Sequence, residues 1–226
     1  MSKVIIGCEE SQAVTIELRL RGVEAYSCDI KPCTGPRPQW HIQDDIFYVL
    51  KKENWKGGIF FPPCTFLTIT ANSWLNIELY GERARQRHED RLEAALFFMR
   101  LYNYPLSHIA IENPVGFFNS IIPPTQIIHP YYFGNPYQKQ TCLWLQNLPP
   151  LQHFKEVDLF NQTITHTKDK GEFVTWVNKK GKKKRQPKWF SDLRALSKEE
   201  RSELRSKTFP GVAQAMAEQW SIFFNQ

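Results

Sequence analysis

The first 118 residues alternate between short β-branched strands and helical stretches, and this alternation limits the folds that the chain can adopt. Strands are expected at 3–8, 23–30, 57–64 and 107–118, because each is a short apolar run bounded by turn residues. Helical patterns lie between them, the longest at 82–103. Strands that alternate with helices indicate a mostly parallel sheet with helices on both faces. We therefore predict an α/β protein.

The second half of the chain is less regular. IIHPYYFG (127–134) and TCLWLQNLP (141–149) are interpreted as further strands. A helix is expected near 197–206, and an amphipathic helix is expected at 208–224. A chain of 226 residues is long enough to bury a core of its own.

Composition excludes several classes of protein. No apolar run approaches the length of a membrane span, and the N-terminus leads directly into strand-like sequence. We therefore expect neither a membrane helix nor a signal peptide, and we predict a cytoplasmic protein, taken as a monomer. The five cysteines are irregularly spaced, which argues against a disulfide framework in that compartment. No metal site is predicted, since Cys28 and Cys33 lack a paired-ligand spacing.

The positive charge of the chain is concentrated in one segment. Residues 179–188, KKGKKKRQPK, hold seven basic residues and no acid. Without them, 22 basic residues stand against 23 acidic ones, a net charge of −1. The segment fits either a solvated loop or a contact with nucleic acid phosphates. The basic cluster RARQR (83–87) with Arg91 leaves the same choice open, between a solvated helix face and a phosphate clamp.

Polar residues follow each predicted strand of the first half. The four strand ends read CEES, CDI, PPC and ENP. Ligands of such sheets bind beyond the carboxyl ends of the strands, so these motifs are expected along one edge. Asp29 closes the second strand and could contact a ribose, although an ordinary strand-end acid remains the alternative. The glycine-rich pattern of a nucleotide-binding loop is missing, because Gly7 is the only glycine where the first strand ends.

The segment GIFFPPCTFL places a thiol directly behind two prolines. Proline fixes the backbone dihedral angle, so Cys64 is presented with little conformational freedom. A nucleophilic cysteine needs an activating partner, and Glu112 at the next strand end is a candidate. Asn113 could orient Glu112 or the substrate. One cysteine and one glutamate suit addition to an electron-poor ring with proton donation to a ring nitrogen; a buried structural thiol is the alternative.

These motifs resemble the cytosine C5 methyltransferases, and more closely their short phage-type members. Pro63-Cys64 after one strand and Glu112-Asn113 after the next have the family's order. CEESQ and Asp29 stand where the cofactor loop and the ribose-binding acid lie, and HIQDD stands where the adenine-contacting Asp45 lies. KQTCLWLQNLP and FPGVAQAMAEQW resemble the glutamine/arginine motif and the C-terminal helix.

The resemblance implies a Rossmann-like methyltransferase fold that uses S-adenosylmethionine to methylate C5 of cytosine in DNA. Residues 1–149 and 205–226 would form the catalytic domain, and 150–204 a small insertion with a basic loop, a reduced target-recognition region. Cys64, Glu112 and Asn113 would be catalytic. The implied cofactor-binding residues are Gly7, Cys8, Glu9, Glu10, Ser11, Asp29, Ile30, Asp45 and Pro62. The implied substrate-binding residues are Pro63, Thr65, Pro114, Gln138, Lys139, Thr141, Lys182, Lys183, Lys184 and Arg185.

The chain departs from the family at three points. IIGCEES replaces the glycine-rich cofactor loop, ENP replaces the usual ENV, and YQKQTC lacks the expected arginine. Two alternatives therefore stay open beside DNA methylation. The same C5 chemistry could act on dCMP, RNA or a hypermodification substrate, or the chain could bind nucleic acid without catalysing transfer.

Overall fold

The computed structural model describes residues 3–157, 163–165, 170–178, 181–197, 200–201, 204 and 207–226. By packing, the chain forms two compact units. Unit 1 contains Met1–Ile128, Gln140–Leu151 and Met216–Gln226, and unit 2 contains His129–Lys139 and Gln152–Ala215. These units are defined by packing alone. The functional division predicted from sequence, with an insertion at 150–204, stays a prediction.

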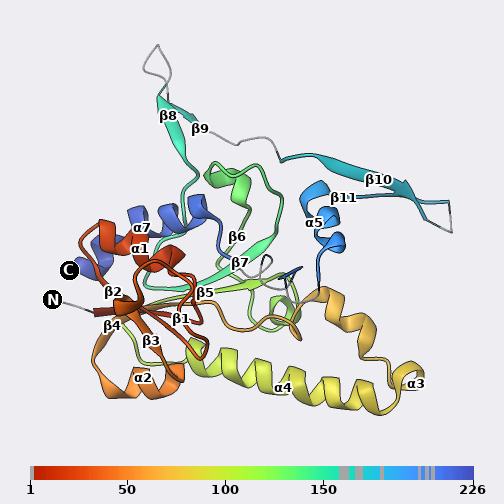
Figure 1. Cartoon of the computed structure of the whole chain (residues 1–226), viewed down its shortest axis with the longest axis horizontal. Coiled ribbons are helices and arrows are strands. Elements are labelled where there is room, and N and C mark those ends of the chain that lie inside the picture. The colour runs from red at the N-terminus through yellow and green to blue at the C-terminus, as the bar shows by residue number, and fades with distance from the viewer. Residues whose placement is uncertain are drawn as a thin grey trace. The chain divides into compact units, whose positions relative to one another are not determined.

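Unit 1 is built on a seven-stranded mixed sheet in the order β3-β2-β1-β4-β5-β7-β6 (Figure 1). The strands are β1 (Lys3–Gly7), β2 (Glu24–Asp29), β3 (His41–Gln43), β4 (Trp55–Phe60), β5 (His108–Pro114), β6 (Gln126–Ile128) and β7 (Thr141–Gln146). The pairs from β3 to β5 are parallel, whereas β7 is antiparallel to both β5 and β6. The predicted α/β class with a mostly parallel sheet is therefore confirmed.

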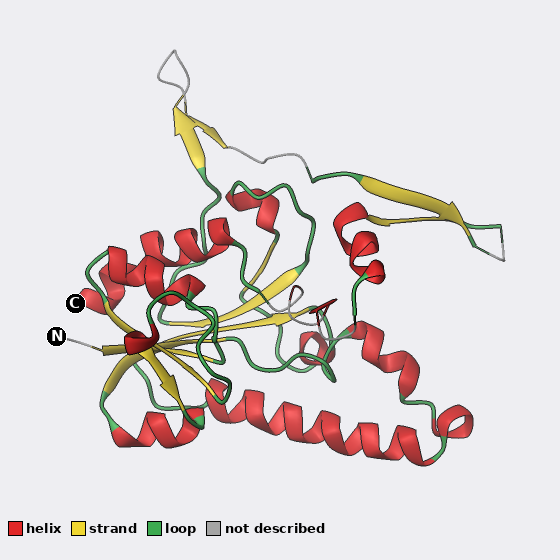
Figure 2. Cartoon of the chain, viewed as in Figure 1, coloured by secondary structure: helices red, strands yellow, loops and turns green. Residues whose placement is uncertain are grey.

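Helices cover both faces of this sheet (Figure 2). The helices of unit 1 are α1 (Ala13–Leu20), α2 (Ile46–Lys52), α3 (Ile77–Tyr80), α4 (Glu82–Tyr102) and the last part of α7 (Pro210–Asn225). Figure 1 shows α1 and α7 on one face and α2 and α4 on the other. Strand side chains alternate between the faces, so Ile5 joins the core with Phe47 and Phe98 while its neighbours Val4 and Ile6 are buried on the opposite side.

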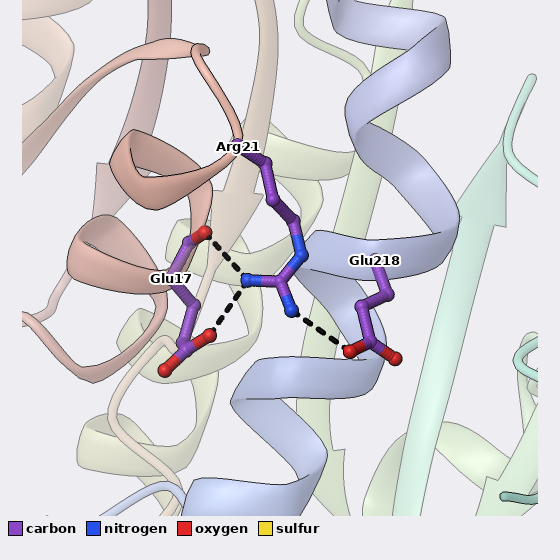
Figure 3. Close-up of polar contacts among 3 residues, drawn as sticks. All are labelled: Glu17, Arg21 and Glu218. Atoms are coloured by element: carbon purple, nitrogen blue, oxygen red, sulfur yellow. Dashed lines mark hydrogen bonds and ion pairs between the residues drawn. The ribbon is translucent and has the colours of Figure 1, made fainter.

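Close packing of α7 against the sheet requires a glycine in β4. A Cβ atom on Gly57 would lie 2.7 Å from Cε1 of Phe224, which is fully buried. The same face carries an ion pair between α1 and α7 (Figure 3). Arg21 donates from Nη1 to Glu17 Oε2 at 2.7 Å and from Nη2 to Glu218 Oε1 at 2.9 Å. These side chains are partly exposed, so the pair contributes at most about 1 kcal/mol.

Unit 2 contains two β-hairpins and short helices. The first hairpin pairs β8 (Lys155–Val157) with β9 (Thr163–Thr165), and the second pairs β10 (Phe173–Val177) with β11 (Lys183–Pro187). Its short helices are η4 (Pro130–Phe133), α5 (Lys188–Asp192) and η5 (Leu193–Ala195). None of the helices in the described part of the chain combines the length and the apolar character needed to cross a membrane.

Several predicted elements are confirmed and others are corrected. The long helix ends at Tyr102, one residue before the prediction. The strand predicted at 57–64 is wrong beyond Phe60, because the prolines that follow supply no N–H for a ladder. The strand predicted at 107–118 is wrong beyond Pro114, because Phe117 starts the 3-10 helix η3 (Phe117–Ser120).

The predicted strand at 127–134 is wrong beyond Ile128, because Pro130 supplies no N–H for a ladder and instead starts η4. Part of the expected basic loop is the strand β11. The helix expected near 197–206 lies largely outside the described residues.

The contact of α7 with β4 generates a stability prediction. Phe224→Ala is expected to lower the free energy of unfolding by about 3–5 kcal/mol, because it leaves a cavity beside Gly57. Ile222→Ala on the same helix, where the isoleucine is 59% exposed, is the matched control and is expected to stay within about 0.5 kcal/mol. Urea unfolding of both variants measures the difference, and equal costs would contradict this packing.

Candidate functional site

The strand order reverses between β1 and β4, and the loops that carry the CEES and PPC motifs leave the sheet there. CEES follows β1 and PPC follows β4. The Phe61 N–H donates to the Gly7 carbonyl at 3.0 Å, so the parallel ladder continues into the start of the PPC loop. Gly7 is needed at this point because a Cβ atom would lie 2.6 Å from Cδ1 of Phe60. A reversal of strand order is where open α/β sheets bind ligands.

One side-chain hydrogen bond joins the PPC loop to the end of β5. Asn113 Nδ2 donates to the Pro62 carbonyl at 3.1 Å. Asn113 is 1% exposed and Pro62 is also buried, so water cannot replace either partner. The PPC and ENP motifs, far apart in sequence, therefore lie side by side, as predicted for neighbouring strand ends.

The backbone on the far side of Cys64 is fixed as well. The Cys64 carbonyl accepts from the N–H groups of Leu67 at 3.0 Å and Thr68 at 3.2 Å, which closes a turn. The Phe117 N–H then donates to the Leu67 carbonyl at 2.8 Å, and a Cβ atom on Gly116 would lie 1.9 Å from that carbonyl oxygen. Only glycine fits there. Cys64 itself is half-buried, between exposed Pro63 and exposed Thr65.

Glu112 lies at the carboxyl end of β5, beside the strand that returns antiparallel. It is opposite Leu143 of β7, and Pro114 is opposite Thr141. Because side chains alternate along a strand, Glu112 points to the other face of the sheet from Asn113. Burial raises the pKa of the Cys142 thiol, and the negative charge of Glu112 adds to that rise.

Three carboxylates converge on the end of β1. Burial raises the pKa of the Cys8 thiol well above its ordinary value, and the charges of Asp29, Asp45 and Glu10 raise it further. Asp29 Oδ1 accepts from the Lys31 N–H at 2.9 Å, which holds that carboxylate at the strand end. We call Glu10, Asp29 and Asp45 the acidic edge. Its side chains attract a cation or hydroxyl donors and repel an anion.

The Glu9 carboxylate is directed into the fold. It is 3% exposed, and it accepts from the Val14 N–H at 2.7 Å and from the Thr15 hydroxyl at 2.7 Å. The Thr15 N–H donates to it at 3.3 Å. Glu9 therefore satisfies the first free N–H groups of α1, and any contribution to cofactor binding would be indirect. Burial raises its pKa to about 7, although the hydrogen bonds oppose that shift.

Asp45 and Gln12 fix the backbone around the acidic edge. Asp45 Oδ1 accepts from the N–H groups of Phe47 and Tyr48 and so caps α2. Gln12 is buried in a left-handed conformation with φ of 62°, and its amide exchanges two hydrogen bonds with the backbone of Arg37. These bonds hold the 31–40 loop against the CEES loop. The role of Gln12 is not predicted from the sequence, because no local pattern marks a buried amide.

The remaining predicted residues fall into two groups. Ser11 is half-buried and Ile30 is 74% exposed, both next to the acidic edge in sequence. Gln138, Lys139 and the basic residues Lys182, Lys183, Lys184 and Arg185 belong to unit 2. There the Gln138 carbonyl accepts from the Trp189 indole at 3.4 Å, and the Lys139 ammonium lies 5.8 Å from the Phe209 ring. Their contribution to the site in unit 1 stays a prediction. Across the described residues, no cluster of three His, Cys, Asp or Glu side chains could hold a metal ion.

Comparison with known proteins adds no family to these observations. No protein-family model matches the chain, and no curated protein matches it in sequence. Function is therefore inferred from the residues of the site.

The bond between Asn113 and Pro62 generates a prediction about Cys64. Asn113→Ala leaves the buried Pro62 carbonyl without its donor, which should lower the free energy of unfolding by about 1–3 kcal/mol. It should also change the rate at which iodoacetamide alkylates Cys64, read by mass spectrometry of the modified peptide. Asn103→Ala, at an exposed helix end, is the matched control. An unchanged alkylation rate in Asn113→Ala would show that this bond does not position the thiol.

The buried Glu9 generates a prediction about pH. Its pKa rises from 4.5 to about 7 on folding, so the folded state holds the proton more tightly. This stability is complete below pH 4.5 and is lost as pH rises toward 7, by up to about 3 kcal/mol. Glu9→Gln cannot ionise. Urea unfolding at pH 5 and pH 8 should therefore show the wild type losing stability relative to Glu9→Gln, and a gain at pH 8 would contradict the assignment.

Proposed function

We propose that the chain is an S-adenosylmethionine-dependent methyltransferase that methylates C5 of cytosine in DNA through a covalent bond to Cys64. The observation that carries this proposal is the hydrogen bond from Asn113 to Pro62, which brings the Cys64 loop and the Glu112 strand end together. The Cys64 loop leaves the sheet at the reversal of strand order between β1 and β4, where a ligand of such a sheet binds, and the Glu112 strand end is on the next strand, β5. A mostly parallel sheet with antiparallel β7 is compatible with the Rossmann-like methyltransferase fold.

The acidic edge supports a positively charged cofactor. S-adenosylmethionine, when bound, supplies its methyl group from a positively charged sulfur. Asp29 at the end of β2 suits the ribose hydroxyls, and Glu10 and Asp45 add negative charge. A dinucleotide would instead place its pyrophosphate on the free N–H groups at the start of α1. Glu9 already occupies those groups, which favours a sulfonium cofactor over a dinucleotide.

The reaction that follows from these residues is conjugate addition. The Cys64 thiolate would bond to C6 of the cytosine ring while Glu112 hydrogen-bonds the ring at N3, so that electron density moves to C5. C5 would then take the methyl group as its bond to the sulfonium sulfur breaks, which would leave a neutral thioether. Transfer of the C5 proton to water and breaking of the sulfur–C6 bond would release the product and restore the thiolate. A base inside a duplex cannot reach such a pocket without leaving the stack.

DNA is proposed as the substrate because positive charge is concentrated in a hairpin of unit 2. Lys183, Lys184 and Arg185 lie on β11, and all three side chains are exposed. Phosphate contacts of this type add affinity without sequence preference. Transfer to dCMP or to RNA is the main competing outcome of the test below.

The decisive test is transfer of labelled methyl from S-adenosylmethionine to duplex DNA, single-stranded DNA, tRNA and dCMP in parallel. We expect label on DNA, and a decrease of at least about 10³-fold in Cys64→Ala, since loss of a covalent nucleophile acts on that scale. Cys33→Ala removes a half-buried thiol within the 31–40 loop and is the matched control.

Three results would change the proposal. Label on dCMP or tRNA alone would replace DNA as the proposed substrate and would leave the proposed reaction unchanged. Label that persists in Cys64→Ala would exclude the covalent adduct. An absence of label on all four substrates would contradict methyl transfer and favour a protein that binds nucleic acid without modifying it.

A further inference from the structure

Helix α4 carries three arginines in one stripe beside the loop that follows Cys64. Arg83, Arg87 and Arg91 are four residues apart, so they share one face of the helix. Arg91 donates from Nε to the Phe66 carbonyl at 2.9 Å and from Nη2 to Asn72 Oδ1 at 2.7 Å. The Arg87 guanidinium lies 5.1 Å from the centre of the Phe66 ring. Two arginines therefore hold a residue only two positions beyond Cys64.

The positive charge of this stripe is not neutralised within the described part of the chain. No carboxylate there lies within ion-pair distance of Arg83, Arg87 or Arg91, whereas neighbouring Arg85 approaches Glu82 at 4.0 Å. Nε of Arg87 is buried and has no hydrogen-bond partner among these residues. Burial and the charge of Arg87 lower the pKa of Arg91. Paired like charges and a buried unused donor indicate a place for an anion.

We propose that Arg87 and Arg91 bind a phosphate group of the substrate next to the base that Cys64 attacks. This inference rests on the proposed function, because it takes the substrate to be a nucleotide or a polymer of nucleotides. Arg87 supplies the donors, since its guanidinium fork matches phosphate geometry. Arg91, fixed by Phe66 and Asn72, supplies the second positive charge. The bound phosphate would be held by the helix that also anchors the Cys64 loop.

Aromatic side chains beside the stripe favour a nucleotide over a simple anion. Trp74 ends the 3-10 helix η2 (Ile69–Trp74), and Tyr80 ends α3. Their ring centres are 5.2 Å apart, and the two residues are 54% and 37% exposed. The ring nitrogen Nε2 of His88 on α4 is hydrogen-bonded to the Leu75 carbonyl at 3.1 Å, which ties this segment to the helix. A nucleotide offers both a phosphate for the arginines and a flat ring for the aromatic pair.

The test measures binding without S-adenosylmethionine. Fluorescence anisotropy follows a labelled oligodeoxynucleotide with one cytosine, carrying either normal phosphates or neutral methylphosphonates on both sides of it. For the wild type, methylphosphonate should weaken binding about 10-fold. Arg87→Gln should weaken binding to the normal strand by a similar factor, lower the salt slope by about 1 and remove the sensitivity to methylphosphonate.

Arg85→Gln is the matched control, because it removes the same charge from an exposed position on the same helix. It should change affinity less than about 2-fold and keep the sensitivity to methylphosphonate. Arg87→Lys keeps the charge but loses the fork, so it should bind more weakly than the wild type. Melting temperatures report whether each variant is folded. If Arg87→Gln does not fold, the affinity of Arg87→Lys and the methylphosphonate comparison decide whether Arg87 binds the phosphate.

Competition by dCMP and deoxycytidine identifies the source of the phosphate. Competition by dCMP alone assigns the site to the nucleotide's own phosphate. Competition by neither, with methylphosphonate sensitivity retained, assigns it to the flanking phosphate of a polymer, and both results support the proposal. Wild-type affinity and sensitivity in Arg87→Gln would overturn it, as would a wild type that binds neither oligonucleotide nor dCMP. Phosphate-dependent binding without methyl transfer would uphold this site and contradict the proposed function.

Discussion

The candidate site depends on one buried hydrogen bond, from the Asn113 amide to the Pro62 carbonyl. The Pro62 carbonyl lies just beyond the end of β4, where the parallel ladder stops, so no N–H group of a neighbouring strand is available to bond it. The Asn113 side chain, on the adjacent strand β5, supplies the donor instead. The thiol of Cys64 is two residues beyond this bond, and the turn to Leu67 and Thr68 closes immediately after it. The β4–β5 edge thus holds the backbone on both sides of Cys64, the proposed nucleophile, in a fixed position.

The two sides of this edge differ in charge, and the difference follows from the strand order. The charges of Glu10, Asp29 and Asp45 act on Cys8 at the end of β1, whereas helix α4 carries Arg87 and Arg91. The carboxylates on one side suit a sulfonium and ribose hydroxyls, and the arginines on the other side suit a phosphate. The reversal of strand order between β1 and β4 separates the two, because β2 and β3 continue from one side and β5 from the other. The proposed methyl donor and the proposed nucleotide acceptor would therefore approach from different directions.

Two residues show why sequence patterns assign roles incompletely. Asp45 was expected to contact a cofactor, and the structure shows that one of its oxygens also caps α2, a role that its position before IFYVL indicates. Glu9 was placed in the cofactor loop, yet its carboxylate turns inward to the start of α1. The sequence CEESQ cannot distinguish Glu9 from Glu10, since the left-handed conformations of Cys8 and Gln12 decide which side chain faces the core. Backbone dihedral angles of this kind depend on packing from both sides.

The sequence by itself determined the α/β class, the existence of the four strands that end at Gly7, Asp29, Phe60 and Pro114, the long helix from Glu82 and the placement of polar motifs at strand ends. Periodicity and turn residues are local signals, so these features need no knowledge of distant contacts. Only the tertiary structure decided that β7 inserts antiparallel beside β5, that Asn113 reaches Pro62, and that Arg87 and Arg91 face the Cys64 loop. Each of these joins segments that are distant along the chain, and such pairings are set by packing of the whole sheet and its helices.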